Sequence, residues 1–309
     1  MSRGKRYDNE PKLNMKKVIA TIIALIVFIM FILSLKNLLT KEEKPKDVVN
    51  VEKYFSAMQD GKWGVINSKG KEIIPVNNNE MVIIPDNTKD IFIVVENVNY
   101  EDGSYTTKVL NKENKEILSD YNHVEAIQNS LNSKIWYEND TLTYMQDGKY
   151  GLIDFSGKKL LDAEYDKIYA LPGIEKSIII EKDGKVGLVT IGKILLEPEY
   201  KEIKSLNKDN SSLGYIVEDT NNKYGVIDGT KKQILDCKYD DIEQVSGNNL
   251  YVVKEDGKYK VIDGNGDTKF DSNYDEILAI NGDNIIVKKD GKCGVVDSNG
   301  EEKIPTEYD

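Results

Sequence analysis

From residue 51 to residue 309, short apolar runs alternate with polar turns in a pattern that returns seven times. A clear copy reads Asp-Gly-Lys, an aromatic residue, glycine and Val-Ile-Asp, and then a glycine turn and another apolar run. Asp-Gly between two apolar runs is the strongest short-range signal for a hairpin, because a type I′ turn needs positive φ at both central residues. The pattern predicts hairpins that pair 178–181 with 186–189, 251–254 with 259–262, and 285–288 with 293–296.

The spacing of the copies defines the repeat. The position after the aromatic slot is held, in chain order, by Gly64, Gly151, Gly187, Gly225, Lys260 and Gly294. The last four gaps are 34 to 38 residues, whereas the first is 87 residues. A less regular copy of the unit, with Lys108 in the glycine slot, divides that long gap into 44 and 43 residues. Repeats at such periods are typical of propellers, solenoids and arrays.

Each unit is predicted to be three antiparallel strands, with a possible short fourth strand at a recurrent Tyr-x-x-Ile element. One such meander cannot bury its own face, so neighbouring units should stack. The aromatic slot and the recurrent tyrosine are the expected packing residues, and the glycine would permit a bulge or a close backbone approach. The alternative for the aromatic residues is a surface that stacks sugars or bases. The residues concerned are Trp63, Tyr150, Tyr224 and Tyr259 in the slot, and Tyr165, Tyr200, Tyr239 and Tyr274 as the recurrent tyrosine.

The Lys-Trp-Gly or Lys-Tyr-Gly core, followed by Val-Ile-Asp, Gly-Lys, an Ile-Pro-like strand and Glu-Tyr-Asp, resembles the bacterial WG-repeat (KWG-repeat) family over residues 51–309. The literal Trp-Gly pair occurs at Trp63-Gly64, and Tyr, Val or Cys stands in elsewhere. The resemblance implies a β-rich repeat domain of bacterial origin, and it supplies no catalytic residues.

The predicted fold is all-β, preceded by a single transmembrane helix. Units of 34 to 44 residues fit the blades of a seven-bladed β-propeller, in which the first and last units would meet and remove exposed edges. The alternative is an open array of the same meanders.

The N-terminal region predicts a membrane anchor. Residues 18–35 form an uncharged run of 18 residues, and a helix of that length spans about 27 Å, close to the thickness of a hydrocarbon core. A cleaved signal peptide is the alternative, but no Ala-x-Ala site follows the run. Residues 1–17 carry six basic residues against four between 36 and 50, which favours a cytoplasmic N-terminus. Residues 36–50 would be a polar stalk, and the repeats at 51–309 would lie outside the cell.

Composition and charge limit the classes of partner that the repeats could bind. The chain has a formal net charge of −11 although its first 17 residues are basic, so the repeats are strongly acidic. An acidic repeat face argues against nucleic acid or anionic lipid as its ligand. The two cysteines, Cys237 and Cys293, fall in different, non-adjacent units, which argues against a disulfide.

Residues with catalytic or metal-binding chemistry are few. The single histidine, His123, is expected at the surface. Asp263, Asn265 and Asp267 imitate the start of a calcium loop, but Thr268 replaces the required glycine and Tyr274 the final glutamate. The aspartates that recur in one phase are expected to cap turns rather than to act as paired catalytic carboxylates, namely Asp154, Asp228, Asp263 and Asp297.

These observations predict a protein with no cofactor, no metal and no enzymatic activity. The expected function is a membrane-anchored binding or scaffold module for a protein or a cell-wall ligand. The alternatives are a structural, self-associating envelope component and an enzyme with a pocket at the centre of a propeller.

Overall fold

A computed structural model describes residues 53–206, 214–244, 250–271, 274–281 and 284–309. Contacts divide the chain into residues 1–51 and a compact unit over residues 52–309. In the described ranges no helix is long and apolar enough to cross a membrane, and the predicted span at residues 18–35 lies outside them. The described residues are all-β and form seven antiparallel sheets.

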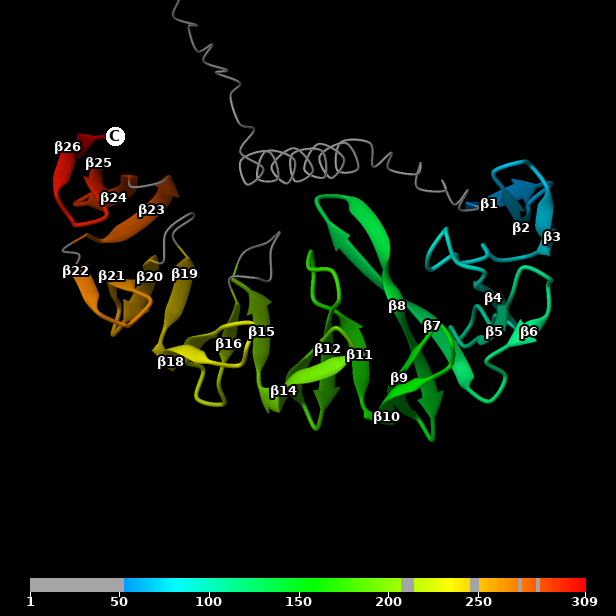
Figure 1. The fold of residues 1–309 in the computed structure, drawn as a ribbon. Helices are drawn as coiled ribbons and strands as arrows, with labels where there is room; N and C mark the ends of the chain where they lie inside the picture. Colours follow the sequence, from blue (N-terminus) through cyan, green and yellow to red (C-terminus); the bar gives the residue numbers. More distant parts are fainter. Residues whose placement is uncertain (1–52, 207–213, 245–249, 272–273, 282–283) are drawn as a thin grey trace, which may run out of the picture. The chain divides into compact units, whose positions relative to one another are not determined.

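The sheets follow one another in chain order (Figure 1). The first two have three strands each: β1 (Tyr54–Gln59), β2 (Lys62–Asn67) and β3 (Glu72–Asn78), then β4 (Phe92–Glu96), β5 (Thr106–Leu110) and β6 (Glu116–Ile117). The third has β7 (Asn122–Leu131), β8 (Lys134–Gln146), β9 (Lys149–Asp154) and β10 (Lys159–Tyr165). The fourth has β11 (Lys167–Ala170), β12 (Ser177–Lys182), β13 (Lys185–Thr190) and β14 (Lys193–Tyr200).

The last three sheets have four strands each. The fifth has β15 (Glu202–Ser205), β16 (Tyr215–Glu218), β17 (Tyr224–Ile227) and β18 (Gln233–Tyr239). The sixth has β19 (Asp241–Gln244), β20 (Leu250–Glu255), β21 (Lys258–Asp263) and β22 (Thr268–Asp271). The seventh has β23 (Glu276–Asn281), β24 (Asn284–Lys289), β25 (Lys292–Asp297) and β26 (Glu302–Tyr308).

The predicted hairpins have the expected register and turn geometry. Ile178 pairs with Val189, and Glu181 pairs with Val186. The turn between them has φ of 52° at Asp183 and 72° at Gly184, as a type I′ turn requires. The same pairing recurs between β20 and β21 and between β24 and β25, so these predictions are confirmed.

The short fourth strand belongs to the sheet that follows it in the chain. β11 comes directly after Tyr165 and Asp166 but pairs with β12, not with β10. The Tyr-Asp corner is therefore the point at which the chain crosses from one sheet to the next. The repeat pattern left open whether this short strand ends one sheet or begins the next, and the structure shows that it begins the next.

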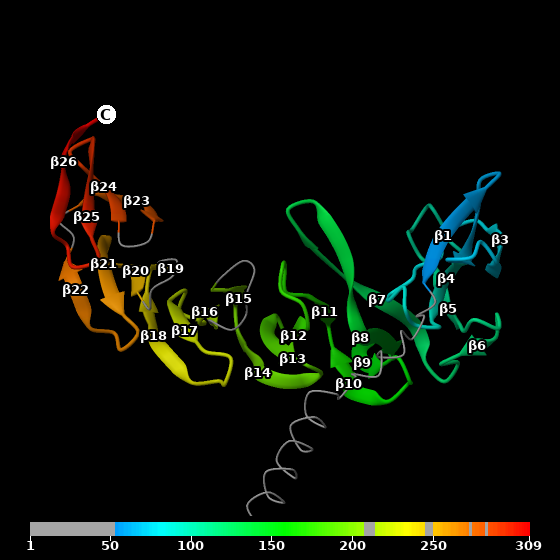
Figure 2. The same cartoon turned by 45° about the horizontal axis from the view of Figure 1, so that its top comes forward.

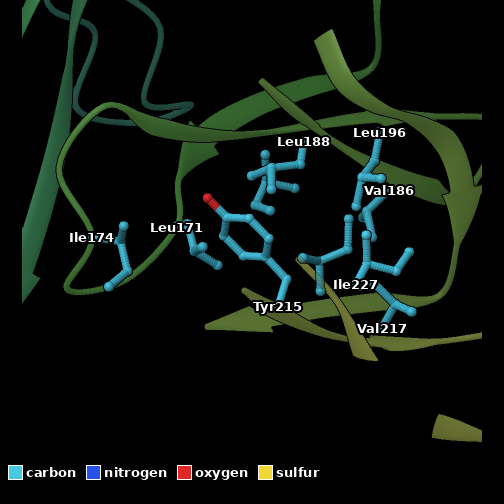
Figure 3. Packing of buried hydrophobic residues seen from close by; sticks show 10 residues of the cluster. Leu171, Ile174, Val186, Leu188, Leu196, Tyr215, Val217 and Ile227 are labelled. Atoms are coloured by element: carbon cyan, nitrogen blue, oxygen red, sulfur yellow. The ribbon is translucent and has the colours of Figure 1, made fainter. Parts of the chain in front are cut away.

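Six apolar clusters fill the spaces between consecutive sheets. Figure 3 shows the cluster between the fourth and fifth sheets, in which the Tyr215 ring of β16 lies beside Leu171 and Leu188. The second to sixth sheets supply apolar side chains to these clusters from both faces, so most of the core lies between sheets. Because one sheet cannot bury both faces alone, stacking holds the array together.

The glycine slot explains how each sheet closes against its third strand. A Cβ atom on Gly187 would lie 2.5 Å from the carbonyl oxygen of Leu196, closer than side-chain atoms approach. The register between β13 and β14 shifts at the same place, so the predicted close approach and bulge both occur. In β21 the slot holds Lys260, and there Lys260 and Val261 pair with Asp271 and Phe270 without a shift. With a side chain at this slot, the register shift beside the slot is missing, and the shift that remains lies between Val261 and Ile262.

Candidate binding site

One hairpin departs from the repeat. β8 has 13 residues, whereas the equivalent strand β12 has six. Beyond the core of the sheet, β7 and β8 stay paired from the pair Gln128↔Tyr137 as far as a tight turn at Asn132 and Ser133. Residues 128–140, called the extension here, project past the neighbouring strands in Figures 1 and 2. The extension therefore presents residues that the other sheets lack.

The extension carries a cluster of large side chains. Trp136 and Tyr137 are half-buried, and Ile135 is 63% exposed. The Lys134 ammonium lies 5.8 Å from the centroid of the Trp136 ring. Burial raises the pKa of the Tyr137 hydroxyl above its ordinary value. Amphipathic aromatic residues of this kind are favoured where proteins bind ligands.

A buried polar network fixes the base of the extension. Asn129 is 3% exposed and Glu138 is 1% exposed, and the Asn129 amide donates to the Glu138 carboxylate over 2.7 Å. The same amide donates to the carbonyl oxygens of Leu171 and Ile174 of the fourth sheet, and its oxygen accepts from Gly173 N. Because these partners lie in the next sheet, the network holds the extension in place.

Glu138 also has a partner from the fourth sheet. Its carboxylate accepts the backbone N–H of Lys176 over 2.6 Å. Burial raises the pKa of Glu138, although its hydrogen bonds act in the opposite direction. Removal of either bond would leave a buried polar group without a partner, which is costly.

An open hollow of about 550 Å³ lies beside the extension. The extension supplies aromatic, cationic and amide groups, and the segment 84–88 supplies a turn in which Asp86 accepts hydrogen bonds from Thr88 N and Thr88 Oγ1 at 2.8 and 2.7 Å. The backbone N–H of Tyr54 donates to the Asn87 carbonyl and ties this turn to the first sheet. The lining residues are Ile84, Pro85, Asp86, Asn87, Thr88, Lys134, Trp136, Tyr137, Asn139 and Glu175.

A second cavity of about 460 Å³ lies between the fourth and fifth sheets. It is lined by Tyr169, Pro172 and Ile203, among others, and by the charged residues Lys201 and Glu202. Burial raises the pKa of Tyr169. This cavity sits beside the short fourth strands β11 and β15, elements that recur along the chain, so it is less distinctive than the hollow.

The aromatic-slot residues lie less deeply than the sequence indicates. Tyr165 and Tyr239 are 3% and 2% exposed and join the clusters between sheets. Tyr200 and Tyr274 are half-buried, and so are Trp63, Tyr150, Tyr224 and Tyr259 of the aromatic slot. The slot pairs directly across β9–β10 and β17–β18 with the recurrent tyrosine, as Tyr150↔Tyr165 and Tyr224↔Tyr239. At these two pairs the recurrent tyrosine takes the deeper position.

The recurrent aspartates cap turns. The Asp154 carboxylate accepts from Ser156 N and Lys158 N at 2.8 and 2.9 Å, and the Asp228 carboxylate accepts from Thr230 N and Lys232 N in the same way. Asp263 accepts from Asn265 N and Asp267 N, so the residues that resemble the start of a calcium loop form the same capped turn. Asp297 caps its turn in the same way. No cluster of metal-ligating side chains occurs in the described parts of the chain.

The remaining candidates have ordinary surroundings. His123 Nε2 lies 3.3 Å from the Glu125 carboxylate, and the His123 ring lies 4.9 Å from that of Tyr105. Cys237 and Cys293 are both free thiols. The residues that sequence reasoning missed are those of the extension. A signal was present in the long gap of 43 residues between Lys108 and Gly151, because the extension lies within it.

The fold defines an all-β repeat protein of stacked antiparallel sheets. Residues 63–77, 224–259 and 261–293 match the family model described as "WG containing repeat", which supports the resemblance in those segments. No curated protein matches the chain.

Solved structures resemble the chain only loosely. A structure described as "the eukaryotic initiation factor" has a TM-score of 0.36 at 13% sequence identity. The match covers 81% of this chain and 72% of the chain in that structure. BamB from Moraxella catarrhalis has a TM-score of 0.28 at 11% identity, with coverage of 81% and 77%. The Dos1 propeller has a TM-score of 0.28 at 15% identity, with coverage of 84% and 78%.

Proposed function

We propose that this chain is a non-catalytic binding module of the cell envelope and that its ligand occupies the hollow beside Trp136. The observation that carries the proposal is the extension, which adds two half-buried aromatic side chains and the exposed Ile135 to one sheet of an otherwise regular repeat. Binding residues are concentrated on segments that a rigid scaffold positions, and here the stacked sheets are that scaffold.

The lining of the hollow favours a polar ligand with apolar surfaces. Trp136 and Tyr137 offer aromatic faces, and Asn87, Thr88 and Asn139 offer hydrogen-bonding groups. The Asn129–Glu138 network holds the extension before any ligand arrives. A preformed site loses less conformational freedom on binding, which favours affinity.

The proposal places the module at the outer surface of the membrane. Residues 18–35 would anchor it in the lipid bilayer, residues 1–17 would be cytoplasmic, and the seven sheets would form a closed propeller-like ring outside. The membrane anchoring and the orientation rest on the apolar run and on the excess of basic residues before it. Protease added to intact cells should remove the repeats and leave a short membrane stub. Cleavage of the repeats only after lysis would indicate the opposite orientation.

Co-purification from solubilised envelope fractions of the source cells tests the binding site. Full-length chain and the Tyr100→Ala control should retain the same envelope component, because Tyr100 is 81% exposed and lies outside the hollow. Trp136→Ala and Tyr137→Ala should each lose it while melting cooperatively. Equal retention by all four proteins would contradict the proposed site.

A further inference from the structure

Every sheet has two packing faces, and the strand register identifies them. The rear face contacts the preceding sheet and is marked by one pair of residues in the central hairpin, such as Ile178↔Val189 in β12–β13. The pairs at the same place in the second, third, fifth, sixth and seventh sheets are Phe92↔Leu110, Leu142↔Ile153, Tyr215↔Ile227, Tyr251↔Ile262 and Ile285↔Val296. All twelve side chains are buried, with at most 5% exposed.

The first sheet has the same rear pair without a neighbour. Phe55 pairs with Ile66, in the place of Ile178 and Val189. Phe55 is 48% exposed and Ile66 is half-buried. The residue types are apolar as elsewhere, but no cluster of buried residues in the described part of the chain includes Phe55 or Ile66.

The forward face contacts the following sheet and is marked by a pair between the third and fourth strands. Leu188↔Leu196 and Val226↔Leu235 are such pairs, and these four side chains are at most 3% exposed. In the seventh sheet the pair is Val295↔Ile304, and Ile304 is 42% exposed.

The recurrent tyrosine shows the same contrast at the forward face. Tyr239 is 2% exposed, whereas Tyr308, at the same place in the seventh sheet, is 55% exposed. The described part of the chain thus contains one unmatched rear face, on the first sheet, and one unmatched forward face, on the seventh.

A polar feature accompanies the forward face. The aspartate after the recurrent tyrosine caps the Asp-Gly hairpin turn of the following sheet: Asp166 accepts from Asp183 N over 2.8 Å, and Asp275 accepts from Asp290 N over 2.7 Å. The same aspartate pairs with the lysine of its own preceding hairpin, as Asp166 does with Lys149.

Asp309 is the equivalent of Asp166 in the seventh sheet. It pairs with Lys292 in the way that Asp166 pairs with Lys149, and its side chain is 92% exposed. The turn that corresponds to Asp183 in the first sheet is Asp60-Gly61, with φ of 50° and 75°. Half of the arrangement found between consecutive sheets is therefore already in place at Asp309.

We propose that the rear face of the first sheet packs on the forward face of the seventh sheet of the same chain, with Phe55 and Ile66 against Val295 and Ile304. In this contact Asp309 accepts the hydrogen bond of Asp60 N. The inference rests on the ring closure included in the proposed function, and not on the ligand hollow. Residues of one chain meet at a high effective concentration, which favours this partner over a second copy. Closure also covers exposed sheet faces and edges that would otherwise promote association.

Cys293 offers a probe of this interface. It pairs with Tyr308 in β25–β26 and lies at the aromatic slot of the forward face. The chain has two cysteines, so Cys237→Ala leaves Cys293 as the sole thiol of the full-length protein. Its rate of reaction with a maleimide, in detergent micelles and relative to the rate in denaturant, reports whether the forward face is covered.

The expected result is at least tenfold protection in Cys237→Ala, unchanged on hundredfold dilution. Adding Phe55→Asp should remove the protection, whereas adding Met58→Asp, on the same strand and 60% exposed, should not. An unprotected thiol in the parent would overturn the proposal without any appeal to the variants. Protection that disappears on dilution would assign the face to a second copy and would equally overturn it. Capture of the envelope component through Trp136 is measured separately, so failure of closure and failure of the ligand site are distinguishable.

Discussion

The third and fourth sheets, β7–β10 and β11–β14, are built from the same repeat but differ in their central hairpins. Leu152 of β9 and Leu188 of β13 take the same position, and both are fully buried. β8, however, is more than twice as long as β12, and its additional residues include Trp136, Tyr137 and Glu138. The comparison separates residues that the repeat needs for stacking from residues that serve one sheet alone. The first group should stabilise every sheet, whereas in the second group the proposed function gives Trp136 and Tyr137 a role in ligand binding and Glu138 a role in holding the extension.

The largest expected effect is on the shared core. Leu188→Ala and Leu152→Ala should each lower the free energy of unfolding by about 2–5 kcal/mol, because each leaves a cavity between sheets. Denaturant titration monitored by far-ultraviolet circular dichroism measures the change. The two losses should be similar. A loss well below 1 kcal/mol at either position would contradict the assignment of that residue to the shared core.

The next effect concerns the buried network at the base of the extension. Glu138→Gln keeps the shape of the side chain but replaces one acceptor by a donor, so either Asn129 or Lys176 N loses its partner. The expected loss of unfolding free energy is about 1–3 kcal/mol. Glu175→Gln is the matched control, since Glu175 is exposed, and it should change stability by less than about 0.5 kcal/mol. Equal stability of the two variants would show that the network contributes nothing.

A smaller effect concerns acid stability, because the two sheets differ in their second turn. Burial raises the pKa of Asp154, but hydrogen bonds from Ser156 and Lys158 outweigh it, so the pKa is lowered. A carboxyl group with a lowered pKa contributes stability above its unfolded pKa, and that contribution disappears as the pH falls through the folded value. The equivalent turn of β13–β14, at Ile191 and Gly192, has no aspartate.

Asp154→Asn should therefore flatten the dependence of stability on pH below about pH 4, where the unfolded carboxyl titrates. Melting temperatures of the parent and the variant, recorded from neutral pH to pH 2.5, measure this difference. Thr190→Asn, at the corresponding position of the fourth sheet, is the control and should leave the pH dependence unchanged. Parallel curves for the parent and Asp154→Asn would rule out the proposed linkage.

Much of the shared architecture is predictable from sequence because its signals are local. Asp183-Gly184 fixes the turn, the register follows from the turn, and Gly187 marks the close approach of β14. The capping role of Asp154 also follows from its place after a strand. These features depend on residues a few positions apart, so the repeat pattern contains them.

The candidate site was not predictable in the same way. Trp136 and Tyr137 belong to no repeated position, and the excess length of the third unit shows only that something is inserted. The Asn129–Glu138 network requires contacts with Leu171 and Lys176, more than 35 residues away. The side of the sheet on which β11 pairs is likewise set by tertiary contacts rather than by its own four residues.

The binding account is tested most directly by the fluorescence of Trp136. The chain has two tryptophans, so Trp63→Phe leaves Trp136 as the sole tryptophan, whose emission can be excited selectively over that of the tyrosines. On titration with the envelope component that the parent retains, the account predicts a saturable shift of Trp136 emission, with a midpoint that Tyr137→Ala weakens at least tenfold and Tyr100→Ala leaves unchanged. Saturable binding without any change in Trp136 emission, and with equal affinity in all three proteins, would contradict the assignment of the hollow as the ligand site.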